Sequence, residues 1–142
     1  MIKLVASDLD GTLLFKGAQS LPEEIFPLIR QLKKMGILFV AASGRQYANM
    51  KKMFRPVVDD MAFISENGGL AVYNEKVLYQ DSLEQELVRE LAENIYDKEG
   101  SEFTCSTKAS YYIRPKTEHL RDLMINVVGN VCNEINSFEE LT

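Results

Sequence analysis

Three short apolar segments, separated by stretches of helical periodicity, constrain the fold of this 142-residue chain more than any other feature. Residues 2–7, 37–42 and 61–65 are β-prone and mostly apolar, and residues 37–42 include no polar side chain. Continuous apolar runs are typical of strands that are buried on both faces of a parallel sheet. The order strand, helix, strand, helix, strand predicts an α/β fold with a parallel sheet and right-handed crossovers.

Helical periodicity between the first two segments predicts an amphipathic helix that ends at Gly36. Ser20 and Glu23 have the spacing of a capping box, and Pro27 should kink the helix or delay its start. Its apolar face is expected to comprise Ile25, Leu28, Ile29, Leu32 and Met35. A second helix is expected over roughly residues 45–54.

The alternation of strands and helices changes near residue 80. Residues 70–80 read as a β-hairpin, and a helix is expected to begin near Ser82 with Leu87, Val88, Leu91 and Ile95 on its buried face. Two antiparallel strands around Lys108–Ala109, a helix that opens at Thr117 and a short helix near the end should follow. We therefore expect two domains, residues 1–82 and residues 83–142.

Composition excludes several function classes. The net charge of −5 gives no electrostatic footprint for nucleic acid. Two distant cysteines and one histidine make a zinc site of thiol and imidazole ligands improbable. No apolar run has the length of a membrane span and no signal peptide is recognisable, so we expect a cytoplasmic protein with free thiols.

Polar, glycine-containing turns follow all three apolar segments. They are Asp8–Thr12, Ser43–Arg45 and Glu66–Gly69. Ligands of open parallel sheets bind outside the carboxyl ends of the strands, so these turns should meet at one edge. A lone Asp-Gly, Ser-Gly-Arg or Asn-Gly is more often a simple turn or a helix cap. The five-residue pattern Asp-x-Asp-Gly-Thr, however, should occur by chance in only about one chain in a thousand of this length.

The residue types in these turns point to phosphoryl transfer. Asp8 and Asp10 stay charged side by side only if a cation or a shared proton relieves their repulsion, and hard oxygen ligands favour Mg²⁺. Glycine turns can hold phosphate oxygens, Ser43 is expected just before a helix, and Arg45 could bind phosphate with two hydrogen bonds. One aspartate could then attack phosphorus while the other transfers protons.

These motifs resemble the haloacid-dehalogenase superfamily, and more narrowly its Cof-like sugar-phosphatase branch with a type IIB cap. The matching segments are Asp8–Leu14, Ala42–Arg45 and Ile64–Gly69. The resemblance is clear over residues 1 to about 80 and weaker beyond. It implies a Rossmann-like α/β core with a partial parallel sheet, followed by the start of an α+β cap.

The resemblance also implies roles for individual residues. Asp8 would be the nucleophile and a Mg²⁺ ligand, and Asp10 the general acid and base, which also binds the metal through its backbone carbonyl. Leu9 and Gly11 would supply backbone to the phosphate loop, with Thr12 supporting the turn. Ser43 and Gly44 would bind the phosphoryl group, and Arg45 and Asn67 would face the substrate.

Two motifs of that superfamily are absent from this sequence. They are a lysine that offsets charge at the nucleophile and a Gly-Asp-rich stretch that supplies further Mg²⁺ ligands. We therefore expect a C-terminally truncated member or a fragment. Its first strand would have an unpaired edge, which favours self-association.

Three functional hypotheses follow. The first is a Mg²⁺-dependent phosphatase that hydrolyses small phosphorylated metabolites, such as sugar phosphates, through an aspartyl-phosphate. The second is a weakly active or inactive remnant that binds phosphate or Mg²⁺ without turnover. A receiver-like signalling domain is the weakest, because receivers carry the acceptor aspartate on the third strand, where this chain has Ser65-Glu66-Asn67.

Overall fold

The computed structural model describes residues 1–15, 18 and 20–141, and the chain divides into two compact units. The first comprises Met1–Asp81 and the second Ser82–Thr142. Each unit has its own sheet and its own hydrophobic core, so each is described by itself. The division falls beside the boundary expected from the sequence, while the roles of core and cap remain predictions for the two parts.

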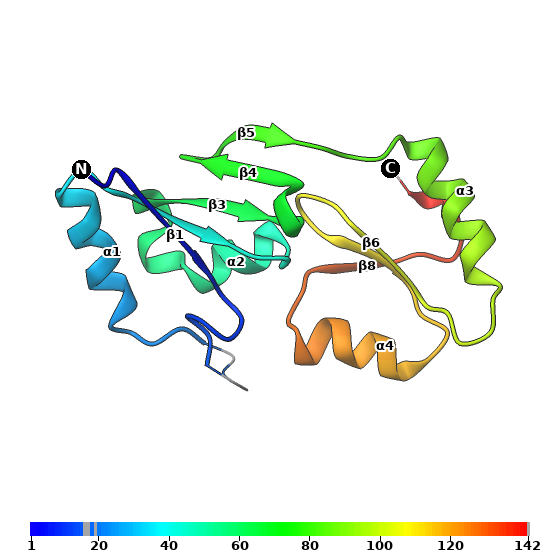
Figure 1. Cartoon of the computed structure of the whole chain (residues 1–142). Helices are drawn as coiled ribbons and strands as arrows, with labels where there is room; N and C mark the ends of the chain where they lie inside the picture. Colours follow the sequence, from blue (N-terminus) through cyan, green and yellow to red (C-terminus); the bar gives the residue numbers. More distant parts are fainter. Residues whose placement is uncertain (16–17, 19, 142) are drawn as a thin grey trace. The chain divides into compact units, whose positions relative to one another are not determined.

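A five-stranded sheet forms the first unit, in the order β1-β2-β3-β4-β5 (Figure 1). Its strands are β1 (Leu4–Asp8), β2 (Leu38–Ala42), β3 (Met61–Ser65), β4 (Leu70–Tyr73) and β5 (Lys76–Gln80). β1, β2 and β3 are parallel, with Ala6 opposite Val40 and Val40 opposite Ala62. β4 pairs antiparallel with both β3 and β5. The expected α/β class with a parallel sheet is therefore confirmed, as is the β4–β5 hairpin.

The two α-helices that the structure describes in the first unit pack on the same face of this sheet. They are α1 (Ile25–Lys34) and α2 (Tyr47–Met53), and a 3₁₀ segment, η1 (Arg55–Asp60), follows α2. Ile29 of α1 and Met50 of α2 share one buried core with Phe39 of β2 and Phe63 of β3. Right-handed crossovers that add strands in one direction place their helices on one side of the sheet, which accounts for this arrangement.

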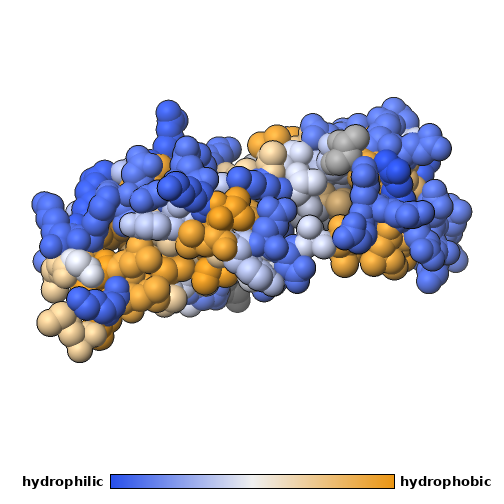
Figure 2. All heavy atoms as spheres, turned by 90° about the horizontal axis from the view of Figure 1, so that it is seen from above, coloured by the Kyte–Doolittle hydropathy of each residue, from blue (hydrophilic) through white to orange (hydrophobic). Residues whose placement is uncertain are grey.

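The opposite face of the sheet exposes apolar side chains. The strand register places Leu4, Ile64 and Tyr79 on this face, where they are 52%, 37% and 54% exposed. Figure 2 shows hydrophobic surface gathered on the first unit, on the left of the view. β1 is also an edge strand. Because the Leu38 amide donates to the Lys3 carbonyl, the backbone groups of Leu4 and Ala6 point away from β2.

The start and buried face of α1 differ from the sequence prediction. The predicted capping box is wrong, because Glu24 is the N-cap and Ser20 lies outside the helix. Pro27 falls in the first turn, where backbone amides have no partner within the helix, and so it delays the helix without kinking it. Leu28 and Met35 are 53% and 65% exposed, so they do not belong to the buried face.

The second unit contains a three-stranded sheet in the order β6-β7-β8. β6 (Phe103–Ser106) and β7 (Tyr111–Arg114) form the expected antiparallel pair, and β8 (Cys132–Glu134) lies parallel to β7. β8 was not predicted, because its three residues lack both an apolar run and an alternating pattern. The small core of this unit comprises Ala92, Ile135, Phe138 and Leu141.

The helices of the second unit occur where the sequence predicts them. α3 (Gln85–Tyr96) packs Val88 against the core as expected, but the rest of the buried stripe consists of Ala92 and Tyr96, which were not predicted. The predicted buried residues Leu87, Leu91 and Ile95 are more than 40% exposed. Both stripes recur every four residues, so periodicity alone does not separate them.

The C-terminal helices are short. Thr117 caps α4 (Glu118–Asp122) as predicted, and its side chain accepts a hydrogen bond from the Leu120 amide. α4 continues into a π-helical turn, η3 (Leu123–Val127). The last expected helix is a 3₁₀ turn, η4 (Phe138–Glu140), with Ser137 at its N-cap. No helix in the described part of the chain is long and apolar enough to cross a membrane.

Candidate active site at the carboxyl end of the parallel strands

The turns that follow β2 and β3 are joined by backbone hydrogen bonds. The Ser43 amide donates to the Ile64 carbonyl at 2.9 Å, and the Asn67 amide donates to the Ser43 carbonyl at 3.3 Å. The Glu66 amide donates to the Arg45 carbonyl at 3.2 Å. Because β2 and β3 are parallel neighbours, these two polar turns form one connected surface at the same edge of the sheet.

Gly44 lies directly against the Asn67 side chain. A Cβ atom added at Gly44 would lie 2.6 Å from the Asn67 Oδ1 atom, closer than real Cβ contacts. Asn67 itself has a φ of 54°, a left-handed conformation that asparagine tolerates better than most residues. The two turns therefore approach each other as closely as they do because residue 44 has no side chain.

The turn after β1 is closed by its own backbone. Leu9 is fully buried, and its carbonyl accepts hydrogen bonds from the amides of Thr12 and Leu14. The Gly11 amide donates to the Leu14 carbonyl at 2.8 Å, and Gly11 has a φ of 85°, which favours glycine. The amides of Gly11 and Thr12 are therefore both already used inside the turn.

An ion pair connects the β1 turn to the β2 turn. The Arg45 Nε donates to Asp10 Oδ2 at 2.9 Å, and Arg45 Nη2 donates to Asp10 Oδ1 at 2.7 Å. The hydrogen bonds and the charge of Arg45 lower the pKa of Asp10, although partial burial opposes this shift. The same hydrogen bonds with Asp10 raise the pKa of Arg45. Asp8, at the end of β1, has an exposed side chain.

The ion pair changes the interpretation of the paired carboxylates. Sequence reasoning treated a metal ion or a shared proton as the relief for their repulsion, but in this structure the guanidinium of Arg45 neutralises Asp10. The sequence contains a basis for this pairing, because Arg45 lies in the turn that follows β2, the strand next to β1, and its long side chain can reach the β1 turn.

Ser43 has neither of the helix-related roles considered from the sequence. It is not an N-cap, because α2 begins at Tyr47 and its N-cap is Gln46. The interpretation of Ser43 as lying just before a helix start is wrong for the same reason. The Ser43 Oγ instead accepts a hydrogen bond from the Arg45 amide at 3.2 Å, within the turn. An anion bound at Ser43 and Gly44 would therefore contact the backbone of a turn and not a helix N-terminus.

The oxygen donors of the site fit a loosely held Mg²⁺. Among the described residues, no three acidic, cysteine or histidine side chains gather as a metal site. The exposed Asp8 carboxylate is one donor. The Asp10 carbonyl is another, since it accepts none of the hydrogen bonds that close the turn within residues 1–15. Mg²⁺ commonly takes one or two protein oxygens and completes its shell with water and phosphate oxygens.

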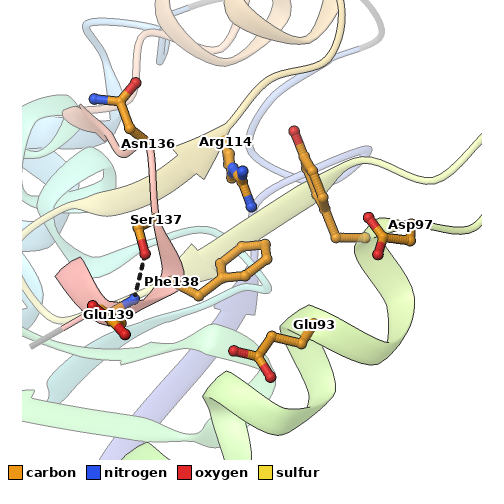
Figure 3. A pocket seen from close by; sticks show the side chains of 8 residues that line it. Glu93, Asp97, Arg114, Asn136, Ser137, Phe138 and Glu139 are labelled. Atoms are coloured by element: carbon orange, nitrogen blue, oxygen red, sulfur yellow. Dashed lines mark hydrogen bonds between the residues drawn. The ribbon is translucent and has the colours of Figure 1, made fainter.

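The second unit has a separate pocket of about 240 Å³ (Figure 3). Its lining residues are Glu93, Tyr96, Asp97, Arg114, Asn136, Ser137, Phe138 and Glu139. The Arg114 guanidinium carbon lies 4.4 Å from the ring centre of Tyr96 and 4.8 Å from that of Phe138. None of the sequence-predicted site residues lines this pocket, and its three carboxylates disfavour a phosphate.

Comparison with known proteins identifies the family. Residues 5–142 match the family model of haloacid dehalogenase-like hydrolases. The 5-amino-6-(5-phospho-D-ribitylamino)uracil phosphatase of Escherichia coli K12 is 28% identical over 140 residues, which cover 99% of this chain and 52% of that protein. Phosphoglycolate phosphatase 1 of Saccharolobus solfataricus is 36% identical over 91 residues, which cover 63% of this chain and 40% of that protein.

Solved structures share the fold. A haloacid dehalogenase-like hydrolase of Bacillus subtilis superposes with a TM-score of 0.78 at 22% identity, covering 99% of this chain and 56% of that one. A sugar phosphatase of subclass IIB superposes with a TM-score of 0.73 at 22% identity, covering 98% and 54%.

The α/β fold, with its polar turns at the carboxyl ends of parallel strands, and the family match lead to one assignment. The chain belongs to the haloacid dehalogenase-like hydrolase family, as the three motifs indicated. Phosphatases are among its curated relatives. The chain spans about half the length of the relatives that it matches over nearly its whole length.

Proposed function

We propose that this chain carries the nucleophile and the phosphate-binding turns of a Mg²⁺-dependent phosphatase for small phosphorylated metabolites. The observation that carries the proposal is the ion pair of Asp10 and Arg45, which joins the β1 and β2 turns beside the exposed Asp8. The relatives support this substrate class, since one acts on a phosphorylated ribitylaminouracil and another on phosphoglycolate by name.

In the proposed reaction, an oxygen of Asp8 attacks phosphorus and the bond to the leaving oxygen breaks, which gives an aspartyl-phosphate. Asp10 donates a proton to the leaving oxygen and then takes a proton from the water that hydrolyses the intermediate. This second step releases inorganic phosphate and restores Asp8. A bound Mg²⁺, held by the Asp8 carboxylate and the Asp10 carbonyl, would offset negative charge on the phosphoryl group.

The remaining turn residues would hold the substrate. Ser43 and Gly44 would contact the transferred phosphoryl group, and Arg45 and Asn67 would face the substrate beside them. Leu9 and Gly11 would contribute to the loop beneath the phosphate mainly as backbone scaffold, because the Leu9 carbonyl and the Gly11 amide already bond within the turn. Thr12 would support that scaffold.

Hydrolysis of an aryl phosphate in the presence of Mg²⁺ tests the proposal. The wild-type chain should release phosphate, and Asp8→Asn should abolish turnover because an amide is a poor nucleophile. Asp59→Asn is the matched control, since Asp59 lies in η1 and no role is assigned to it. Equal rates for wild type and Asp8→Asn would refute Asp8 as the nucleophile.

A second candidate is a domain that binds phosphate or Mg²⁺ without turnover. It is favoured by the absence of a cluster of three acidic ligands among the described residues, and by the engagement of both Asp10 oxygens by Arg45. Calorimetric titrations with Mg²⁺ and with inorganic phosphate would support it if both bind while no hydrolysis occurs. Measurable turnover by the purified chain would exclude it.

A further inference from the structure

Arg45 occupies both side-chain oxygens of Asp10. Two of its donors, Nε and Nη2, form parallel hydrogen bonds with the two carboxylate oxygens at 2.9 and 2.7 Å. The third donor group, Nη1, has a long contact of 3.5 Å with Asn49 Oδ1. The Asp10 side chain is 57% exposed and that of Arg45 is 25% exposed, so a ligand from solvent can reach the pair.

This arrangement conflicts with the role of general acid and base that is proposed for Asp10. An acid or base must bring one of its oxygens within hydrogen-bonding distance of the leaving group or of water, and both oxygens already face Arg45. Arg45 is also the residue directly after Gly44, in the turn proposed to hold phosphate. A phosphate group has the geometry and the charge to accept the same pair of parallel hydrogen bonds from a guanidinium.

We propose that Arg45 exchanges Asp10 for the phosphoryl group when a phosphorylated ligand binds at Ser43 and Gly44, so that ligand binding frees the Asp10 side chain. Arg45 is then a positioning residue that holds Asp10 away from reaction until the phosphate site is filled. The inference rests on the proposed function, because it takes the phosphate site from it. It adds an ordered coupling between phosphate binding and the availability of Asp10.

NMR titration of the metal-free chain with inorganic phosphate tests the exchange without any need for turnover. The Arg45 Nε–Hε signal should shift on phosphate addition, together with the backbone amides of Ser43 and Gly44. Arg30 is an internal control, because its guanidinium contacts Asp60 and the Pro56 carbonyl. Its signal should stay unchanged, and potassium chloride at equal ionic strength should reproduce none of these shifts.

A double-mutant cycle separates exchange from simple charge repulsion. Asp10→Asn should tighten phosphate binding about tenfold, because the competing carboxylate is gone, and Arg45→Gln should weaken it by about as much. In the Arg45→Gln background, Asp10→Asn should have little further effect. A tightening that persists without Arg45 would reflect repulsion alone and would overturn the exchange.

The outcomes also distinguish the inference from the function on which it rests. Phosphate shifts at Ser43 and Gly44 with an unmoved Arg45 signal would overturn the exchange and leave the phosphate site standing. No phosphate response at Ser43 and Gly44 would overturn both. Joint shifts, together with tightening by Asp10→Asn only when Arg45 is present, would support the exchange.

Discussion

Replacing Gly44 with alanine should disturb the contact between the β2 and β3 turns. The new Cβ would lie 2.6 Å from the Asn67 Oδ1 atom, so either the Asn67 side chain or the backbone of the turn must move. Overpacking by one methyl group costs about 1–3 kcal/mol. For a chain of this size, each kcal/mol lowers the melting temperature by roughly 2–4 °C, so Gly44→Ala should lose about 2–12 °C.

The Asn67 side chain, with which the new Cβ would clash, can be removed independently. Asn67→Gly deletes the side chain and suits the φ of 54° at that position, so it removes the obstacle without straining the turn. Gly44→Ala should therefore cost at least about 1 kcal/mol less in the Asn67→Gly background than in the wild type. Thermal unfolding by circular dichroism measures all four proteins. An equal loss in both backgrounds would refute the close approach of the two turns.

Three further predictions test the core, the ion pair and the free edge. Phe63→Ala should destabilise the first unit by about 3–5 kcal/mol in urea unfolding, because this buried ring packs edge-on against two aromatic neighbours. A loss below 1 kcal/mol, or roughly a tenth of the total stability, would contradict that packing. Arg45 lowers the pKa of Asp10, so the ion pair stabilises the fold above the ordinary pKa of 3.8 and loses this effect as the pH falls through the lowered pKa. The difference in melting temperature between wild type and Arg45→Gln should therefore be present near neutral pH and disappear in acid. A difference that persists in acid would contradict the ion pair. The unpaired β1 edge should support self-association detectable by sedimentation, which Ala6→Lys should abolish, whereas a monomeric wild-type chain would refute it.

The order of the elements could be predicted because it depends on local pattern. The uninterrupted apolar run at 37–42 specifies a buried strand, and the polar residues that follow it mark the strand's end. The face that a helix buries could not be predicted in the same way. In α3, Leu87 and Ala92 lie on neighbouring stripes, and packing against η4, not hydrophobicity, buries the smaller residue.

The candidate site was predictable in position but not in its pairings. Parallel strands bring Asp10 and Arg45 to one edge, and the sequence shows that much. Which cation would relieve Asp10 depends on the reach and direction of a side chain from the neighbouring strand, and sequence spacing does not specify these. β8 was missed because its residues Cys132–Glu134 pair with β7 through backbone groups, which leave no mark on the side-chain pattern.

The central claim is that Asp8 is the residue that receives the phosphoryl group. Mass spectrometry of the chain, quenched in acid during hydrolysis of an aryl phosphate with Mg²⁺, tests it most directly. The account predicts an adduct with the mass of one phosphoryl group on the peptide that contains Asp8, and no such adduct in Asp8→Asn. Turnover without an adduct on that peptide, or an adduct that persists in Asp8→Asn, would contradict it.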